Sequence, residues 1–63
     1  MKVPDNIVQQ INEVKRELRV RQYVYKKWIK EGKMDEQTAR FQINLMNDVL
    51  HTLEELKKET LPY

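Results

Sequence analysis

The sequence predicts an all-α protein folded as an antiparallel hairpin of two long helices. Two stretches of apolar residues at helical spacing are separated by one short break at residues 31–35, and the chain of 63 residues has no cysteine. Apolar residues that repeat every three or four positions are typical of amphipathic helices. We therefore expect one domain over residues 1–63, with a first helix at about 5–31, a turn at 32–35 and a second helix at about 36–58.

The first predicted helix has a plausible start and a heptad-like inner stripe. Asp5 or Asn6 suits an N-cap, and Pro4 is tolerated where a helix begins. Steps of three and four residues alternate along the stripe, as they do in helices that pack along one seam. The stripe consists of Ile7, Ile11, Val14, Leu18, Arg21, Tyr25, Trp28 and Ile29.

The residues of the break predict where the first helix ends and where the second begins. Gly32, the only glycine, suits the left-handed position that follows a helix, and Asp35 suits the N-cap of the next one. Pro62 cannot continue a helix, so the second one should end before residues 61–63. Its inner stripe is Ala39, Ile43, Met46, Leu50 and Leu53, widened by Val49 and Leu56.

Both helices carry more apolar surface than one seam requires, which favours self-association. A core this small rarely supplies more than ~3–5 kcal/mol, and without cysteines the usual remaining support is oligomerisation. Two hairpins paired as a homodimeric four-helix bundle would cover the extra apolar residues. The alternative is a monomer with scattered exposed apolar residues. The predicted oligomer interface consists of Arg21, Val24, Trp28, Phe41, Leu45 and Val49.

Arg21 interrupts the apolar stripe of the first helix. A buried guanidinium group costs several kcal/mol unless it is paired. Arg21 either extends to the edge of the seam or pairs with a carboxylate of a partner helix, such as Asp48 or Glu36. A paired polar residue in a seam fixes register and oligomeric state.

Charge divides unevenly along the chain. Residues 12–33 contain eight basic and three acidic residues, net +5, whereas residues 34–63 contain three and six, net −3. The basic outer face of the first helix is a candidate contact surface for a protein partner or a nucleic acid. The alternative is an ordinary solvated face, partly paired with Glu13 and Glu17. The candidate contact residues are Lys15, Arg16, Arg19, Tyr23, Lys26, Lys27 and Lys30.

The residue types do not predict catalysis. His51 should lie on the exposed face of the second helix, and neither a nucleophile nor a glycine-rich phosphate loop accompanies it. We expect a non-enzymatic protein without a cofactor or metal. The chain shows no apolar signal sequence or membrane-spanning run, so a cytoplasmic location without a membrane contact is expected.

The middle of the chain resembles a set of small phage and prophage proteins. The resemblance lies in the arginine-rich residues 17–25 that end in Val24 and Tyr25, the Gly32-Lys33 turn, and Ile43 and Met46 of the second helix. It implies a phage setting, with the protein in the cytoplasm of the host cell, and a small accessory role. It implies no catalytic residues.

Three functions follow as hypotheses. The first is an accessory protein that binds and modulates a host or phage protein. The second is a small nucleic-acid-binding protein that uses the basic face of the first helix. The third is a structural self-assembly module.

Overall fold

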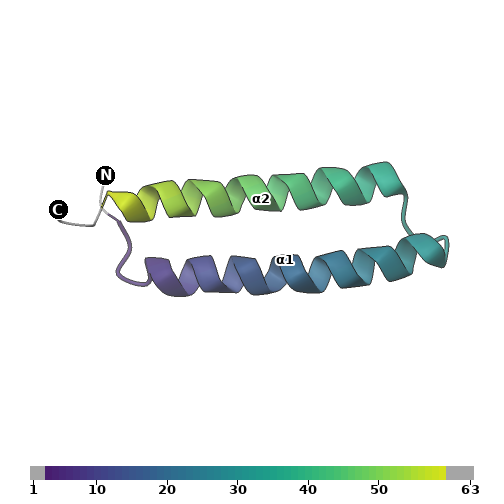
Figure 1. The fold of residues 1–63 in the computed structure, drawn as a ribbon, viewed down its shortest axis with the longest axis horizontal. Coiled ribbons are helices and arrows are strands. Elements are labelled where there is room, and N and C mark those ends of the chain that lie inside the picture. Colours follow the sequence, from purple (N-terminus) through teal and green to yellow (C-terminus); the bar gives the residue numbers. More distant parts are fainter. Residues whose placement is uncertain (1–2, 60–63) are drawn as a thin grey trace.

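The computed structural model describes residues 3–59 and confirms an all-helical hairpin over this part of the chain. Helix α1 covers Ile7–Lys30 and helix α2 covers Glu36–Lys58, and no strand occurs among the described residues. The helices run antiparallel and contact each other along their length in a rod of 49 × 17 × 16 Å (Figure 1). The expectation that residues 61–63 end the second helix lies outside the described residues.

The turn between the helices closes with a Schellman motif. Gly32 has a φ of 74°, and its amide donates to the carbonyl of Ile29 at 3.1 Å, while the amide of Lys33 donates to the carbonyl of Trp28 at 2.8 Å. A positive φ is accessible to glycine without steric cost, so Gly32 ends α1 as the sequence predicts. The Asp35 side chain then caps α2 by accepting from the amides of two following residues, at 3.1 and 3.3 Å.

The start of α1 differs from the expectation. The helix begins at Ile7, whose amide donates to the carbonyl of Pro4 at 3.2 Å, and Asn6 occupies the N-cap position without a capping side-chain bond. The Asn6 side chain instead accepts a hydrogen bond from Gln10 at 2.8 Å. This entrance therefore lacks the side-chain cap that fixes the entrance of α2.

The core of the hairpin is one narrow seam. Its buried residues are Ile7, Ile11, Leu18, Tyr25 and Ala39. The other predicted stripe residues are half-buried because a second helix covers only one side of each helix. Trp28 and Val49 are exceptions, at 40% and 43% exposed, and Trp28 stacks on Tyr25 with ring centroids 5.9 Å apart. Ile29, four residues after Tyr25, occupies the seam position that the sequence also assigned to Trp28.

Candidate binding surfaces

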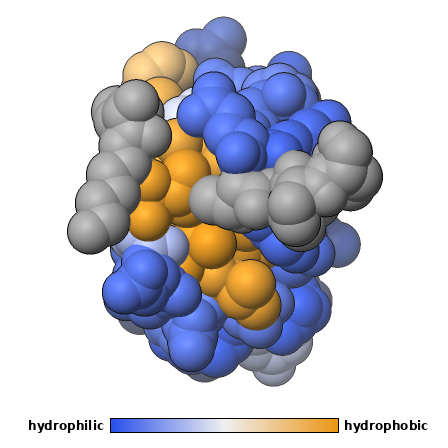
Figure 2. Space-filling view, turned by 90° about the vertical axis from the view of Figure 1, so that its left-hand side faces the viewer, coloured by the Kyte–Doolittle hydropathy of each residue, from blue (hydrophilic) through white to orange (hydrophobic). Residues whose placement is uncertain are grey.

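One side of the hairpin carries an uncovered apolar face, which we define by Arg21, Val24, Trp28, Phe41, Leu45 and Val49. Phe41 is 66% exposed and Leu45 53% exposed. Both helices contribute to this side, because Arg21 of α1 lines one shallow groove together with Phe41, Leu45 and Val49 of α2. Seen from the end opposite the turn, apolar atoms extend from the centre of the rod to its upper left edge, while the right-hand side is hydrophilic (Figure 2).

A polar belt crosses the apolar face, formed by Glu17, Arg21, Tyr25 and Gln42. The Nε of Arg21 donates to Glu17 Oε1 at 2.9 Å, one turn earlier on α1. The hydroxyl of Tyr25 donates to Gln42 Oε1 on α2 at 2.8 Å. The hydrogen bond to Glu17, with a smaller contribution from Tyr25, raises the pKa of Arg21 above its ordinary value. Both Arg21 and Glu17 keep about a third of their side chains exposed, at 34%.

Arg21 therefore finds its carboxylate within its own helix and not on α2. The expected partners Asp48 and Glu36 are both exposed. Glu36 lines a groove on the other side of the hairpin, with Lys26 and Arg40. Glu17 lies four residues before Arg21, and this spacing brings side chains together on one helical face.

The predicted basic face divides into paired and unpaired cations. Arg16 pairs with Glu13, and Lys15 approaches Glu54 of α2 at 3.9 Å. The Glu13 hydrogen bond raises the pKa of Arg16, and the same contact lowers the pKa of Glu13. The described part of the chain offers no ion-pair partner within 4.0 Å to the other four predicted cations, Arg19, Lys26, Lys27 and Lys30.

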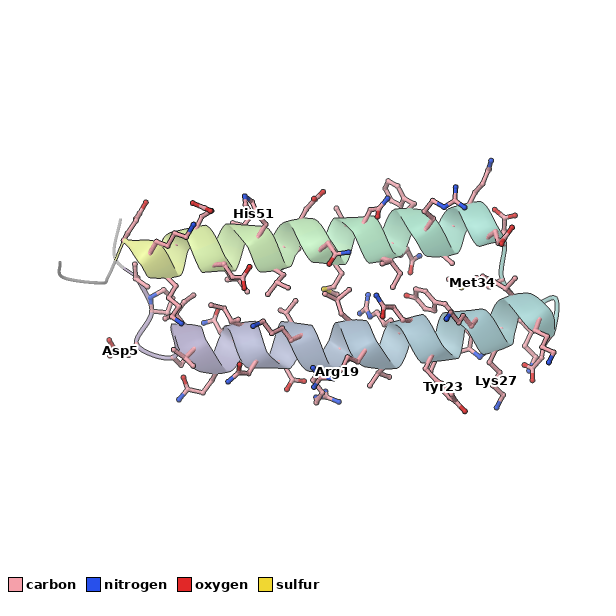
Figure 3. The ribbon with its side chains drawn as sticks, viewed as in Figure 1. Asp5, Arg19, Tyr23, Lys27, Met34 and His51 are labelled. Carbon is pink, nitrogen blue, oxygen red and sulfur yellow. The ribbon has the colours of Figure 1, made fainter. Side chains whose placement is uncertain are left out.

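These four cations and Tyr23 form what we call the basic ridge, with Lys26 at its edge, where it also lines the groove that contains Glu36 and Arg40. Arg19, Tyr23 and Lys27 point away from α2, along the outer edge of α1 (Figure 3). Tyr23 is 75% exposed. Lys27 and Lys30 also lie in the last turn of α1, where they complement the negative end of the helix dipole. The ridge and the apolar face lie on different sides of α1, so a partner bound to one surface does not block binding to the other.

The remaining polar side carries His51. The His51 side chain is 75% exposed, and its Nε2 lies 3.9 Å from Glu55 Oε1. Within residues 3–59, no three His, Cys, Asp or Glu side chains gather closely enough to hold a metal ion. None of the described helices is long and apolar enough to cross a membrane.

Sequence reasoning missed two members of the polar belt. Glu17 was detectable, because it precedes Arg21 by four residues on the same helix. Gln42 was not, because its contact with Tyr25 depends on how far the two helices slide along each other, which the turn geometry sets.

Comparison with known proteins adds no relative: no family model, curated protein or solved structure matches this chain.

Proposed function

We propose that this chain is a small, non-catalytic accessory protein that acts as a homodimer and docks on a host or phage protein in the cytoplasm of the host cell. The phage setting rests on the sequence resemblance. The observation that supports the dimer is the exposed apolar face, where Phe41, Leu45 and Val49 of α2 remain exposed beside Arg21 of α1. Exposed apolar surface that spans two elements typically marks an interaction site.

The size of the apolar face suits a second copy of the chain. Helix α1 has 24 residues, or about 36 Å at 1.5 Å per residue, and the rod is 17 Å wide. Face-to-face packing would bury roughly 600 Å² per copy and about 1,200 Å² in total, which is at the lower end of stable protein interfaces. Two hairpins joined in this way form a four-helix bundle.

The dimer leaves the basic ridge available for the protein partner. Four cations without ion-pair partners favour an acidic surface, because complementary charge steers association. In this proposal the apolar face joins the two copies, and the ridge contacts the partner.

A nucleic acid is the second candidate ligand of the ridge. The observation that favours it is Tyr23, which is 75% exposed among the unpaired cations. An exposed aromatic ring stacks on a nucleotide base while cations contact the adjacent phosphates. Tyrosine is also enriched in protein–protein interfaces, so the strand preference of binding, and not the ring by itself, separates the two ligands.

Light scattering tests the dimer. Wild-type protein at micromolar concentration should have twice the chain mass of 7.7 kDa. Leu45→Glu should shift the mass towards one chain, because it places a charge in the interface. Val8→Glu is the matched control: Val8 is 46% exposed and lies seven residues before Lys15, hence on the side of the Lys15–Glu54 contact. A wild-type mass of 7.7 kDa would contradict the proposed dimer.

A charge-matched pair of variants tests the ridge. Arg19→Gln, Lys27→Gln and Lys30→Gln together should abolish capture of the protein partner from bacterial lysate while the dimer mass is kept. Substitution of Lys33, Arg40 and Lys58 by Gln removes the same charge elsewhere and should leave capture unchanged. Equal capture by both variants would rule out the ridge as the contact surface.

Fluorescence anisotropy separates the two ligand classes. If the ridge binds nucleic acid, labelled single-stranded or duplex DNA should bind at ~50 mM salt and dissociate as salt rises towards ~200 mM, with a logarithmic slope of about −0.9 per phosphate contact on the duplex. Tyr23→Ala should weaken binding of the single strand more than that of the duplex, because only unpaired bases are free to stack. No binding at the lowest salt would leave the acidic protein as the ligand.

A further inference from the structure

We infer that the two copies pack with their turns at opposite ends, so that α1 lies antiparallel on α1 of the second copy and Arg21 of each copy pairs with Glu17 of the other. This inference rests on the proposed dimer and specifies its arrangement. It is carried by the positions of the polar belt and of the apolar residues along the rod.

Two symmetric arrangements bring the apolar face of one hairpin onto that of another. A two-fold axis along the rod keeps both turns at one end and stacks α1 on α2 of the second copy. A two-fold axis across the rod places the turns at opposite ends and stacks each helix on its own counterpart. Both arrangements are closed and self-complementary, as dimer interfaces require. They differ in which side chains face each other.

The crosswise axis gives full overlap only if it passes through the middle of the rod. The middle of α1, Ile7–Lys30, falls between residues 18 and 19, and the middle of α2, Glu36–Lys58, is residue 47. Residues 19 and 47 are at the same level, because each is eleven residues from the helix end at the turn, Lys30 and Glu36 respectively. One axis therefore passes through the middle of both helices.

Two pairs of residues at the interface are arranged symmetrically about that axis. Glu17 and Arg21 lie two residues on either side of residue 19, so the axis brings Arg21 of one copy to the level of Glu17 of the other. Leu45 and Val49 lie two residues on either side of residue 47, so they face each other across the interface. The charged pair and the apolar pair thus match in the same register.

Hydrogen bonding favours the crosswise arrangement. Within one chain, the Nε of Arg21 donates to Glu17 Oε1 at 2.9 Å, and Tyr25 adds a weaker side-chain interaction with the guanidinium group. A guanidinium has five N–H donors, and burial without acceptors is costly. The second copy's Glu17 supplies a carboxylate in the crosswise arrangement. In the lengthwise arrangement, Arg21 would face the apolar flank of α2, at Phe41, Leu45 and Val49.

Distance measurement between spin labels at the turn tests the arrangement. The chain has no cysteine, so Lys33→Cys provides one exposed attachment point per copy. Turns at opposite ends should give a label separation of roughly 40 Å, the length of the helices, whereas turns at one end should give less than about 25 Å, two to three helix diameters. A second label at Asn47→Cys, at the middle of α2, should give a short distance in either arrangement and confirms that the labelled protein is dimeric.

The outcomes distinguish the arrangement from the dimer itself. A long distance at Lys33→Cys with a short one at Asn47→Cys supports the inference. Short distances at both positions overturn the arrangement and leave the dimer intact. No dipolar coupling at either position, together with a mass of 7.7 kDa, overturns the dimer and the arrangement together.

Exchange of charge tests the Arg21–Glu17 contact between copies. Glu17→Lys leaves two cations in the belt and Arg21→Glu leaves two carboxylates, so each variant alone should dimerise about tenfold more weakly than wild type. An equimolar mixture of the two should recover the lost affinity as a mixed dimer, because cations then face carboxylates. No recovery on mixing would show that the belts do not meet, since the repulsion within each chain is unchanged by mixing.

Discussion

The hydroxyl group of Tyr25 donates a hydrogen bond to Oε1 of Gln42 at 2.8 Å, and this bond joins the two helices across the seam. Tyr25 is 8% exposed, so the bond forms at the edge of the core, where competition from water is reduced. It forms in only one register of α1 along α2, the register that the turn geometry sets, and it stabilises that register. The apolar face and the polar belt both depend on that register.

Removal of the Tyr25 hydroxyl should destabilise the protein without disturbing its packing. Tyr25→Phe should lower the free energy of unfolding by about 1 kcal/mol, the net contribution of a typical hydrogen bond. Chemical denaturation of Tyr25→Phe, Gln42→Leu and the double variant measures their coupling. Tyr23→Phe is the matched control, because Tyr23 is 75% exposed and should change stability by less than about 0.5 kcal/mol. A similar loss in both single tyrosine variants would contradict a specific role of Tyr25.

Gly32 should resist replacement by any residue with a side chain. Its φ of 74° is costly for L-amino acids, although a Cβ there would meet no atom within 4 Å. Gly32→Ala should therefore destabilise the hairpin by about 1–2 kcal/mol through backbone strain alone. Gly32→Asn should cost less, because asparagine tolerates this conformation better. The thermal unfolding midpoints of the wild type, Gly32→Asn and Gly32→Ala should fall in that order. An unchanged midpoint in Gly32→Ala would show that the turn adopts another geometry.

The Glu13–Arg16 ion pair predicts a titration shift. The hydrogen bond from Arg16 lowers the pKa of Glu13, so the folded chain binds this proton less readily than the unfolded chain. The pair's contribution to stability is therefore present above the ordinary pKa range of glutamate and is lost as pH falls through the lower, folded pKa. In Arg16→Gln, the NMR titration midpoint of Glu13 should rise to its ordinary value. Because the side chains of both Glu13 and Arg16 are more than half exposed, high salt should have a similar effect in the wild-type protein.

The features predictable from the sequence are those that depend on neighbouring residues in the chain. Two helices, the Gly32 stop and the Asp35 cap all follow from local chemistry, and the structure contains each of them. Of the two alternatives for Arg21, the structure contains the position at the edge of the seam, where its side chain is 34% exposed, and its carboxylate is Glu17 of the same helix and not Asp48 or Glu36. The pairing of the basic face with Glu13 was among the alternatives, whereas the Lys15–Glu54 contact could not be foreseen, because it depends on the register of the two helices.

Leu18 and Phe41 should separate folding from association. Leu18 is 7% exposed against α2, so Leu18→Ala removes buried methyl groups and should lower the free energy of unfolding by about 2–5 kcal/mol. Phe41 is 66% exposed in a single chain, so Phe41→Ala removes little from the seam. Its ring belongs to the apolar face, and its loss should weaken the dimer.

Urea unfolding at several protein concentrations distinguishes these two roles. Binding of a second copy stabilises the folded state, so the midpoint of the wild-type protein should rise with concentration. Leu18→Ala should lower the midpoint at every concentration. Phe41→Ala should instead remove most of the dependence on concentration, because the variant is mainly monomeric in the range where the wild type pairs. If both variants lose helix equally at the lowest concentration, Phe41 belongs to the folding core, and the apolar face is not the surface that joins two copies.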